Sequence, residues 1–258
     1  MLLGRRPPQP SRHIVLAHPD LPLEQLADAV AAAGAEVLWH LPLVHGLIVS
    51  CPGPATCAAV LGIPGVAAVE DGRTALPRPL RPLGAAPAAA PLRRALVAWG
   101  VARVGAPWAW TRTRGEGVKV AIIDTGADWT HPSLAPNIHG GVNILAPGEP
   151  PDDDHGRGTH VAGIIAGADG PGIAVGMGPR CSLYVVKAFD ASGAAATGDV
   201  LLALEWCAAQ GMQVVNTTCS VDRPQATKNR APAELPGRPV LEVRSRGVDF
   251  RIRRRPPG

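Results

Sequence analysis

Residues 120–134, which read VAIIDTGADWTHPSL, decide the fold of this 258-residue chain. The segment starts with four consecutive apolar residues, a pattern typical of a strand that is buried on both faces of a parallel sheet. The strand ends at Asp124, and Thr125 and Gly126 follow directly. Because open α/β sheets build their sites at the carboxyl ends of their strands, the carboxylate of Asp124 is a candidate functional group.

Strands and helices alternate on both sides of this segment, over residues 93–222. The expected strands are 118–124, 182–187 and 212–216, and the expected helices are 159–166 and 200–210. Such alternation predicts the N-terminal half of a doubly wound α/β domain, with a parallel sheet and helices on both faces. The last expected strand, 212–216, should then have an unpaired edge.

A smaller module is predicted at residues 12–75. Its expected strands are 13–16, 36–41, 43–50 and 66–70, and its expected helices are 21–33, with Asp20 as N-cap, and 55–61. The order strand, helix, strand, strand, helix, strand is that of a ferredoxin-like α+β module. Residues 1–11 are predicted to be unstructured, and the Pro- and Ala-rich residues 76–92 to be a linker between the two domains.

The last segment, 223–258, differs in composition from the rest. It carries ten Lys and Arg against three Asp and Glu, a balance of +7, so residues 1–222 carry 4 − 7 = −3. The basic charge therefore belongs to the tail and does not argue for nucleic-acid binding by the whole protein. Abundant Arg and Pro without apolar periodicity are typical of a disordered tail or of out-of-frame translation, with weak strands at most at 240–243 and 248–252.

Cysteine usage and apolar runs restrict the function further. The five cysteines, Cys51, Cys57, Cys181, Cys207 and Cys219, have no metal-ligand spacing along the sequence and are interpreted as small buried apolar residues. No apolar run is long enough to cross a membrane, and no apolar segment typical of a secretion signal follows Arg5 and Arg6. We therefore expect neither a nucleic acid nor a membrane among the partners.

Four segments in order carry a resemblance to a known family: 120–134, 152–167 (DDDHGRGTHVAGIIAG), 176–193 and 203–216. Over about 93–216 the chain resembles the subtilisin-like serine proteases, or subtilases. The resemblance implies a serine endopeptidase precursor acting on peptides or proteins, with Asp124 as the carboxylate that orients the catalytic base. Residues 12–75, ending in PGVAAVED at 64–71, resemble the inhibitory propeptide of this family, which implies packing against the peptidase domain.

The catalytic machinery departs from the family at two points. Arg157 occupies the position of the family's histidine base, and a guanidinium keeps its proton, so it is not a general base. His155 and His160 lie nearby but are not expected to replace the base. The nucleophile's Gly-Thr-Ser-Met-Ala motif and the oxyanion-hole Asn do not occur, so we expect a truncated chain that is inactive by itself. We further predict that Asp124 and Arg157 form a salt bridge, for which a bidentate geometry would suit both groups.

Other site residues follow from the resemblance. Thr218, Cys219 and Ser220 stand at the family's substrate-binding strand, and Ser133 replaces the Asp that is a usual calcium ligand, so no metal or other cofactor is expected. The acidic run 152–154 is interpreted as a solvated loop.

Three hypotheses on function stay open. The chain is an inactive protease relic, a module acting in trans as protease inhibitor or folding helper, or an active secreted subtilase whose gene record carries a substitution and a frameshift. The family resemblance implies secretion, whereas residues 1–11 show no secretion-signal pattern. The sequence therefore assigns no compartment.

Overall fold

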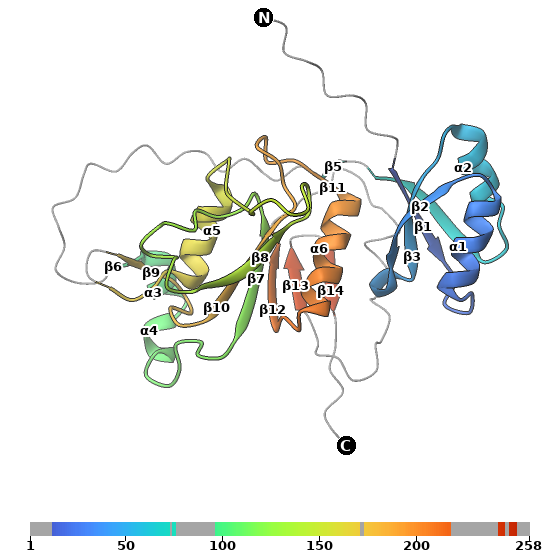
Figure 1. The fold of residues 1–258 in the computed structure, drawn as a ribbon. Helices are drawn as coiled ribbons and strands as arrows, with labels where there is room; N and C mark the ends of the chain where they lie inside the picture. Colours follow the sequence, from blue (N-terminus) through green and yellow to red (C-terminus); the bar gives the residue numbers. More distant parts are fainter. Residues whose placement is uncertain are drawn as a thin grey trace, which may run out of the picture.

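Two layered units make up this computed structural model, which describes residues 12–72, 74–75, 96–170, 173–217, 242–245 and 248–251. Figure 1 shows the N-terminal unit beside the larger one, with helix α6 (Thr197–Ala209) between their sheets. The parallel α/β architecture expected for the larger unit is confirmed.

The N-terminal unit is a four-stranded antiparallel sheet covered on one face by two helices. Its elements are β1 (Arg12–Ala17), α1 (Leu23–Ala32), β2 (Glu36–Leu41), β3 (Gly46–Ser50), α2 (Pro54–Leu61) and β4 (Val66–Asp71). The strand order is β2-β3-β1-β4. Alternate residues of β1 point to opposite faces. Val15 and Ala17 therefore pack under α1 and α2, whereas Ile14 and Leu16 face the other unit.

The larger unit is built on a four-stranded parallel sheet in the order β12-β7-β10-β8. Its strands are β7 (Lys119–Asp124), β8 (Ile138–Asn143), β10 (Ser182–Lys187) and β12 (Val214–Thr217). One face, with Val120 and Ile122, packs on α5 (Arg157–Ala166). The opposite face, with Ala121 and Ile123, packs on α6. The two helices thus cover opposite faces, as expected for a doubly wound sheet.

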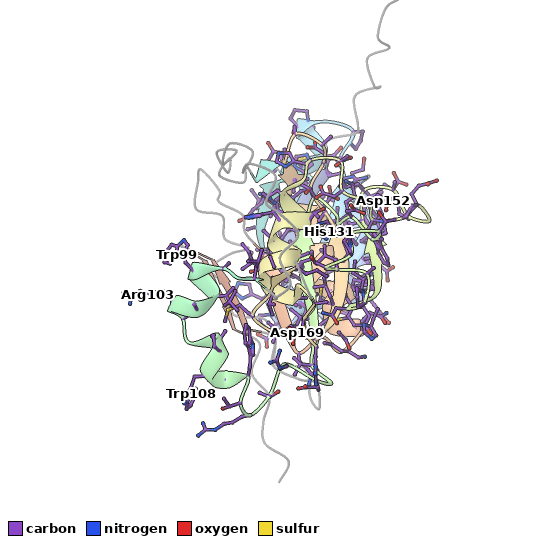
Figure 2. All side chains as sticks on the ribbon, turned by 90° about the vertical axis from the view of Figure 1, so that its left-hand side faces the viewer. Trp99, Arg103, Trp108, His131, Asp152 and Asp169 are labelled. Carbon is purple, nitrogen blue, oxygen red and sulfur yellow. The ribbon has the colours of Figure 1, made fainter. Side chains whose placement is uncertain are left out.

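Short elements complete the described part of the larger unit. They are β6 (Leu96–Val97), α3 (Trp99–Arg103), α4 (Ala106–Ala109), β9 (Ala174–Val175) and β11 (Ala195–Ala196). Figure 2 shows Trp99, Arg103 and Trp108 on α3 and α4 pointing away from the body of the molecule, and the two indoles are 81% and 65% exposed. These helices therefore present aromatic and basic side chains to solvent.

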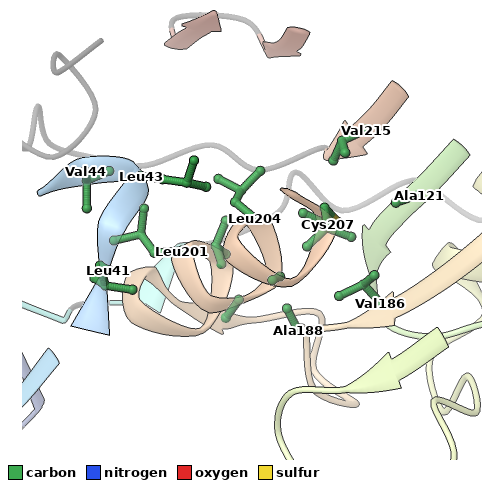
Figure 3. Packing of buried hydrophobic residues seen from close by; sticks show 14 of the residues in the cluster. Leu41, Leu43, Val44, Ala121, Val186, Ala188, Leu201, Leu204, Cys207 and Val215 are labelled. Atoms are coloured by element: carbon green, nitrogen blue, oxygen red, sulfur yellow. The ribbon is translucent and has the colours of Figure 1, made fainter. Parts of the chain in front are cut away.

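A single apolar cluster joins the two units across α6. Leu41 and Leu43 from the N-terminal unit meet Leu201 and Leu204 of the helix, and the same cluster continues to the sheet at Val186 (Figure 3). Burying such side chains stabilises a contact by about 1.5–3 kcal/mol each. Both faces of the N-terminal sheet therefore pack against helices, one against α1 and α2 and the other against α6.

Polar contacts fix the orientation of the two units. The Arg12 guanidinium lies 3.1 Å from the Asp199 carboxylate, and the Leu43 amide donates to Glu205 Oε1 at 2.6 Å. Burial raises the pKa of Asp199 above its ordinary value, against the opposing effect of the Arg12 charge. A short strand β5 (Thr74–Ala75) also pairs antiparallel with β11, so backbone as well as side chains connects the units.

Three details of the sequence prediction need correction. Asp20 does not cap α1, because the N-cap is Pro22 and no side chain binds there. The strand expected at 43–50 starts only at Gly46, after a 3-10 turn over Pro42–Val44. Strand β8 was missed, since IHGGVN carries no strand pattern. Its Gly141 is needed because a Cβ there would collide with the Val185 carbonyl of β10.

Strand β12 is the edge of its sheet, and Val214 on it is 44% exposed. Strands β13 (Glu242–Ser245) and β14 (Val248–Arg251) form a separate antiparallel pair, and β13 lies near β12. Most of the segment interpreted as a disordered or out-of-frame tail lies outside the described residues, so that interpretation stays a prediction. Among the residues that the structure describes, no helix is long and apolar enough to cross a membrane.

Candidate active site

A buried ion pair occupies the carboxyl end of β7. Arg157 Nε donates to Asp124 Oδ1 at 2.8 Å, and the two side chains are 4% and 0% exposed. The backbone amide of Thr125 donates to the same oxygen at 2.7 Å. The predicted Asp124–Arg157 salt bridge is therefore present.

The guanidinium does not engage the carboxylate in the bidentate manner that we expected. Arg157 Nη2 is buried and has no hydrogen-bond partner among the described residues, so the fork of Nε and Nη2 is not formed. The Cζ atom instead lies 4.8 Å from the centroid of the Phe189 ring, a favourable cation–π distance. One face of the guanidinium is thus covered by the Phe189 ring.

Tight backbone packing places Arg157 at the first residue of α5. Gly156 precedes it with φ of 91°, a left-handed conformation that favours glycine. A Cβ on Gly158 would collide with the carbonyl oxygen of Gly126, so the start of the helix lies directly against the turn after β7. The Gly158 amide also donates to Thr125 Oγ1 at 3.0 Å. Asp124 and Arg157 are therefore held by two adjoining glycine turns.

Asp153 organises the loop before α5 and is half-buried. It accepts hydrogen bonds from the Thr125 and Thr159 hydroxyls and from three backbone amides, at 2.6–3.0 Å. Burial alone would raise its pKa, but these hydrogen bonds lower the pKa below its ordinary value. Asp154 pairs with the buried Lys187 at 2.6 Å. Asp152 and Asp154 are exposed, as the solvated-loop interpretation of 152–154 expected, whereas Asp153 is half-buried and corrects that interpretation at one position.

The two nearby histidines differ from Asp124 in their burial. His155 and His160 are exposed, whereas Asp124 is fully buried. Without an imidazole on Asp124, the pair has a proton donor in Arg157 and an acceptor that is already bound. At the described site the buried Asp124 carboxylate is therefore neutralised by a guanidinium, a group that donates hydrogen bonds and accepts none.

The sequence analysis did not predict a short antiparallel strand pairing between the two units. Ala195 and Ala196 of β11 pair with Ala75 and Thr74 of β5, so an extended segment is already bound through its backbone. Backbone pairing of this type recognises extended peptides with little dependence on side chains. A two-residue Ala strand has no periodicity, so no sequence signal could have identified it.

The remaining predicted site residues are placed less directly. Thr218, Cys219 and Ser220 lie outside the described residues, so their assignment to substrate binding stays a prediction. Ser133 is buried, and its carbonyl accepts the Ala168 amide at 2.7 Å. Its hydroxyl is a poor substitute for a calcium-binding carboxylate. Within the described residues Ser133 adjoins no group of three or more His, Cys, Asp or Glu ligands, and the expectation that no metal binds here stays a prediction.

The sequence of this chain is similar to a known family model and to several characterised proteins. The profile of the subtilase family matches residues 115–243, which include Asp124 and Arg157. Subtilisin Savinase from Lederbergia lenta is 42% identical over 153 residues, 58% of this chain and 55% of that protein. An alkaline protease from Alkalihalobacillus alcalophilus is 42% identical over 153 residues, 39% of its length. Thermitase from Thermoactinomyces vulgaris is 36% identical over 120 residues, 46% of this chain and 43% of that protein.

These matches cover only part of the relatives. The chain spans 55% of the length of subtilisin Savinase and 39% of the length of the alkaline protease.

Proposed function

This chain belongs to the subtilase family, and on that premise we propose that it is a subtilisin-like endopeptidase precursor whose described site does not hydrolyse peptide bonds. Its substrates by family are peptides or proteins. The observation that carries the proposal is the buried contact of 2.8 Å between Arg157 Nε and Asp124 Oδ1.

The chemical argument concerns the proton of the nucleophile. Serine attack on a peptide carbonyl needs a neighbouring group that accepts the hydroxyl proton and later returns it to the leaving amine. A guanidinium has five N–H donors and no acceptor atom, so Arg157 supports neither transfer.

Hydrolysis of a chromogenic peptide tests this function. The purified chain should release no product above the rate of its Asp124→Ala variant, with subtilisin Savinase as the active reference. Arg157→His should be assayed beside them, because it restores an acceptor at the base position without changing Asp124. A serine-inhibitor-sensitive rate in the unaltered chain that disappears in Asp124→Ala would overturn the proposal.

A second function is supported by the contacts between the two units. The N-terminal unit covers α6 with Leu41, Leu43 and Ile48, and β5 pairs with the strand that follows β10. An inhibitory propeptide would need an apolar contact with the enzyme surface and a segment that pairs with the enzyme's peptide-binding strand. We propose that residues 12–75 act in this way on their own chain or on a related protease.

Inhibition in trans tests the second function. Residues 12–75 are titrated against subtilisin Savinase, and slower hydrolysis at micromolar concentration is expected. Ile48→Glu, on the face that packs against α6, should abolish the effect, because it puts a charge into an apolar contact. Gln25→Glu, at an exposed position of α1, adds the same single negative charge away from this contact and is the matched control. No slowing by the unaltered module would eliminate this function.

A further inference from the structure

A cluster of three metal-ligand side chains lies in the N-terminal unit, away from the peptidase-type site. His13 comes from β1, Cys51 follows the last residue of β3, and Cys57 belongs to α2. The imidazole nitrogen and the two sulfur atoms all lie within 4.8 Å of one another. It is the one such group of three or more His, Cys, Asp or Glu side chains within the described ranges.

The fold brings these residues together through strand register. His13 pairs with Val49 in the antiparallel β1–β3 ladder, and side chains paired in this way share a face. Cys51 stands two residues beyond Val49 and therefore returns to that same face. The turn at 52–53 then reverses the chain, so that Cys57 packs from α2 onto the cluster that contains Cys51. Three separate elements thus direct their donors to one point.

The donors match one class of ligand. Two thiolates and one imidazole are a common ligand set for Zn²⁺, with Zn–S of about 2.3 Å and Zn–N of about 2.0–2.1 Å. Tetrahedral angles at these lengths place the donor atoms about 3.5–3.8 Å apart. The observed limit of 4.8 Å exceeds this by about 1 Å, so small side-chain rotations would close the site. Softer donors of this kind do not suit Ca²⁺ or Mg²⁺.

Burial also suits a metal with one open position. Cys51 is 4% exposed and belongs to the apolar core, whereas His13 and Cys57 are half-buried. One side of the cluster is therefore accessible to solvent. Asp71 is the cross-strand neighbour of His13 on β4, on this same face. Its carboxylate is a candidate partner for the imidazole, because carboxylates commonly orient metal-bound histidines.

From this juxtaposition we propose that His13, Cys51 and Cys57 bind one Zn²⁺ ion, which joins β1, the end of β3 and α2. The site is distinct from Asp124 and Arg157. It lies on the helix-covered face of the N-terminal sheet, whereas the opposite face packs on α6. Zinc would therefore stabilise the unit in the form that docks, without taking part in the docking contacts. A metal that binds only the folded form raises the unfolding temperature with its concentration.

Cobalt substitution in the full-length chain tests the site. The chain is reduced, stripped with a chelator and titrated with Co²⁺, whose thiolate charge-transfer and d–d bands report sulfur ligation and tetrahedral geometry. We expect one Co²⁺ per chain, displaced by one Zn²⁺. At a zinc concentration about 100 times the dissociation constant, the unfolding midpoint should rise by about 5–10 °C.

Matched variants identify the ligands. Cys57→Ala and His13→Gln should each weaken Zn²⁺ binding by about 100-fold or more, since loss of an outer partner alone costs 10–100-fold. Cys181→Ala and His18→Gln remove the same residue types elsewhere and should retain the affinity. Far-UV circular dichroism of the metal-free proteins checks that each variant is folded.

Two results would overturn the proposal. One is Co²⁺ or Zn²⁺ binding that is equally strong in Cys57→Ala and in Cys181→Ala. The other is a Cys51–Cys57 disulfide, found by non-reducing mass spectrometry of protein prepared with zinc present, because it would remove both sulfur donors.

Discussion

Removing the charge of Arg157 should cost far more stability than removing a surface arginine. In Arg157→Met the side-chain length is kept and the guanidinium is lost, which leaves the fully buried Asp124 carboxylate without its cation. Loss of one partner of a buried pair costs about 3–5 kcal/mol, against about 0–1 kcal/mol for an exposed pair. The exposures of 4% and 0% place this pair in the first class.

Two further contacts adjust that magnitude. The unpartnered Nη2 of Arg157 already costs about 1 kcal/mol or more, and the substitution relieves it. Loss of the cation–π contact with Phe189 acts in the opposite direction, by about 0.5–2 kcal/mol. We therefore expect a net loss of about 2–5 kcal/mol, which lowers the unfolding midpoint by roughly 5–15 °C for a chain of this size.

A double-mutant cycle separates the pair from its surroundings. Asp124→Val leaves a buried guanidinium unpaired and should cost at least as much as Arg157→Met. The double variant should be more stable than either single one, because an apolar pair replaces two charges. The free energy of unfolding is measured by urea titration, followed both by tryptophan fluorescence and by circular dichroism to check for one transition.

An exposed ion pair supplies the control. Arg180→Met makes the same chemical change where Arg180 and Glu116 are 60% and 51% exposed and 3.3 Å apart, so its cost should be much smaller than that of Arg157→Met because solvent screens the pair. If Arg157→Met costs no more than Arg180→Met, the buried ionised pair is refuted.

Three other predictions concern the supports of the site and of the interface. Because hydrogen bonds lower the pKa of Asp153 in the folded chain, its stabilising effect is complete above the unfolded pKa of about 3.9 and is lost as the pH falls through the lower folded value. The stability difference between the chain and Asp153→Asn, from urea midpoints, should therefore shrink from about pH 6 to about pH 3, and a constant difference would contradict the assignment. Gly158→Ala should destabilise by about 1–3 kcal/mol through the clash with the Gly126 carbonyl, whereas Gly163→Ala on the same helix meets nothing and should not destabilise. Leu201→Ala should cost about 2–5 kcal/mol, and amide exchange should speed up in β1 and β2, which pack on this residue's helix, if the two units stabilise each other.

The larger sheet was predictable because its central strands are uninterrupted apolar runs. The strand at 182–187 was predicted with its observed bounds, and the strand at 118–124 differs from β7 by a single residue. Strand β8 was not predicted, because two of its six residues are glycines and give no hydrophobic pattern. Both glycines lie in close contact with β10. Where a strand is specified by backbone proximity, local periodicity carries no information about it.

Some features of the candidate site could likewise be predicted from the sequence, and others could not. The sequence alone determined that Asp124 follows a buried strand, that Arg157 replaces the base and that the two should pair, because each statement depends on residue type and motif order. Only the tertiary structure decided that Arg157 binds through Nε with Nη2 unpartnered, and that the half-buried Asp153 accepts five hydrogen bonds. It also brought His13 to Cys51 and Cys57, which lie 38 or more positions away along the chain. The physical reason is that hydrogen-bond geometry and donor convergence depend on strand register and helix packing, which join residues distant in sequence.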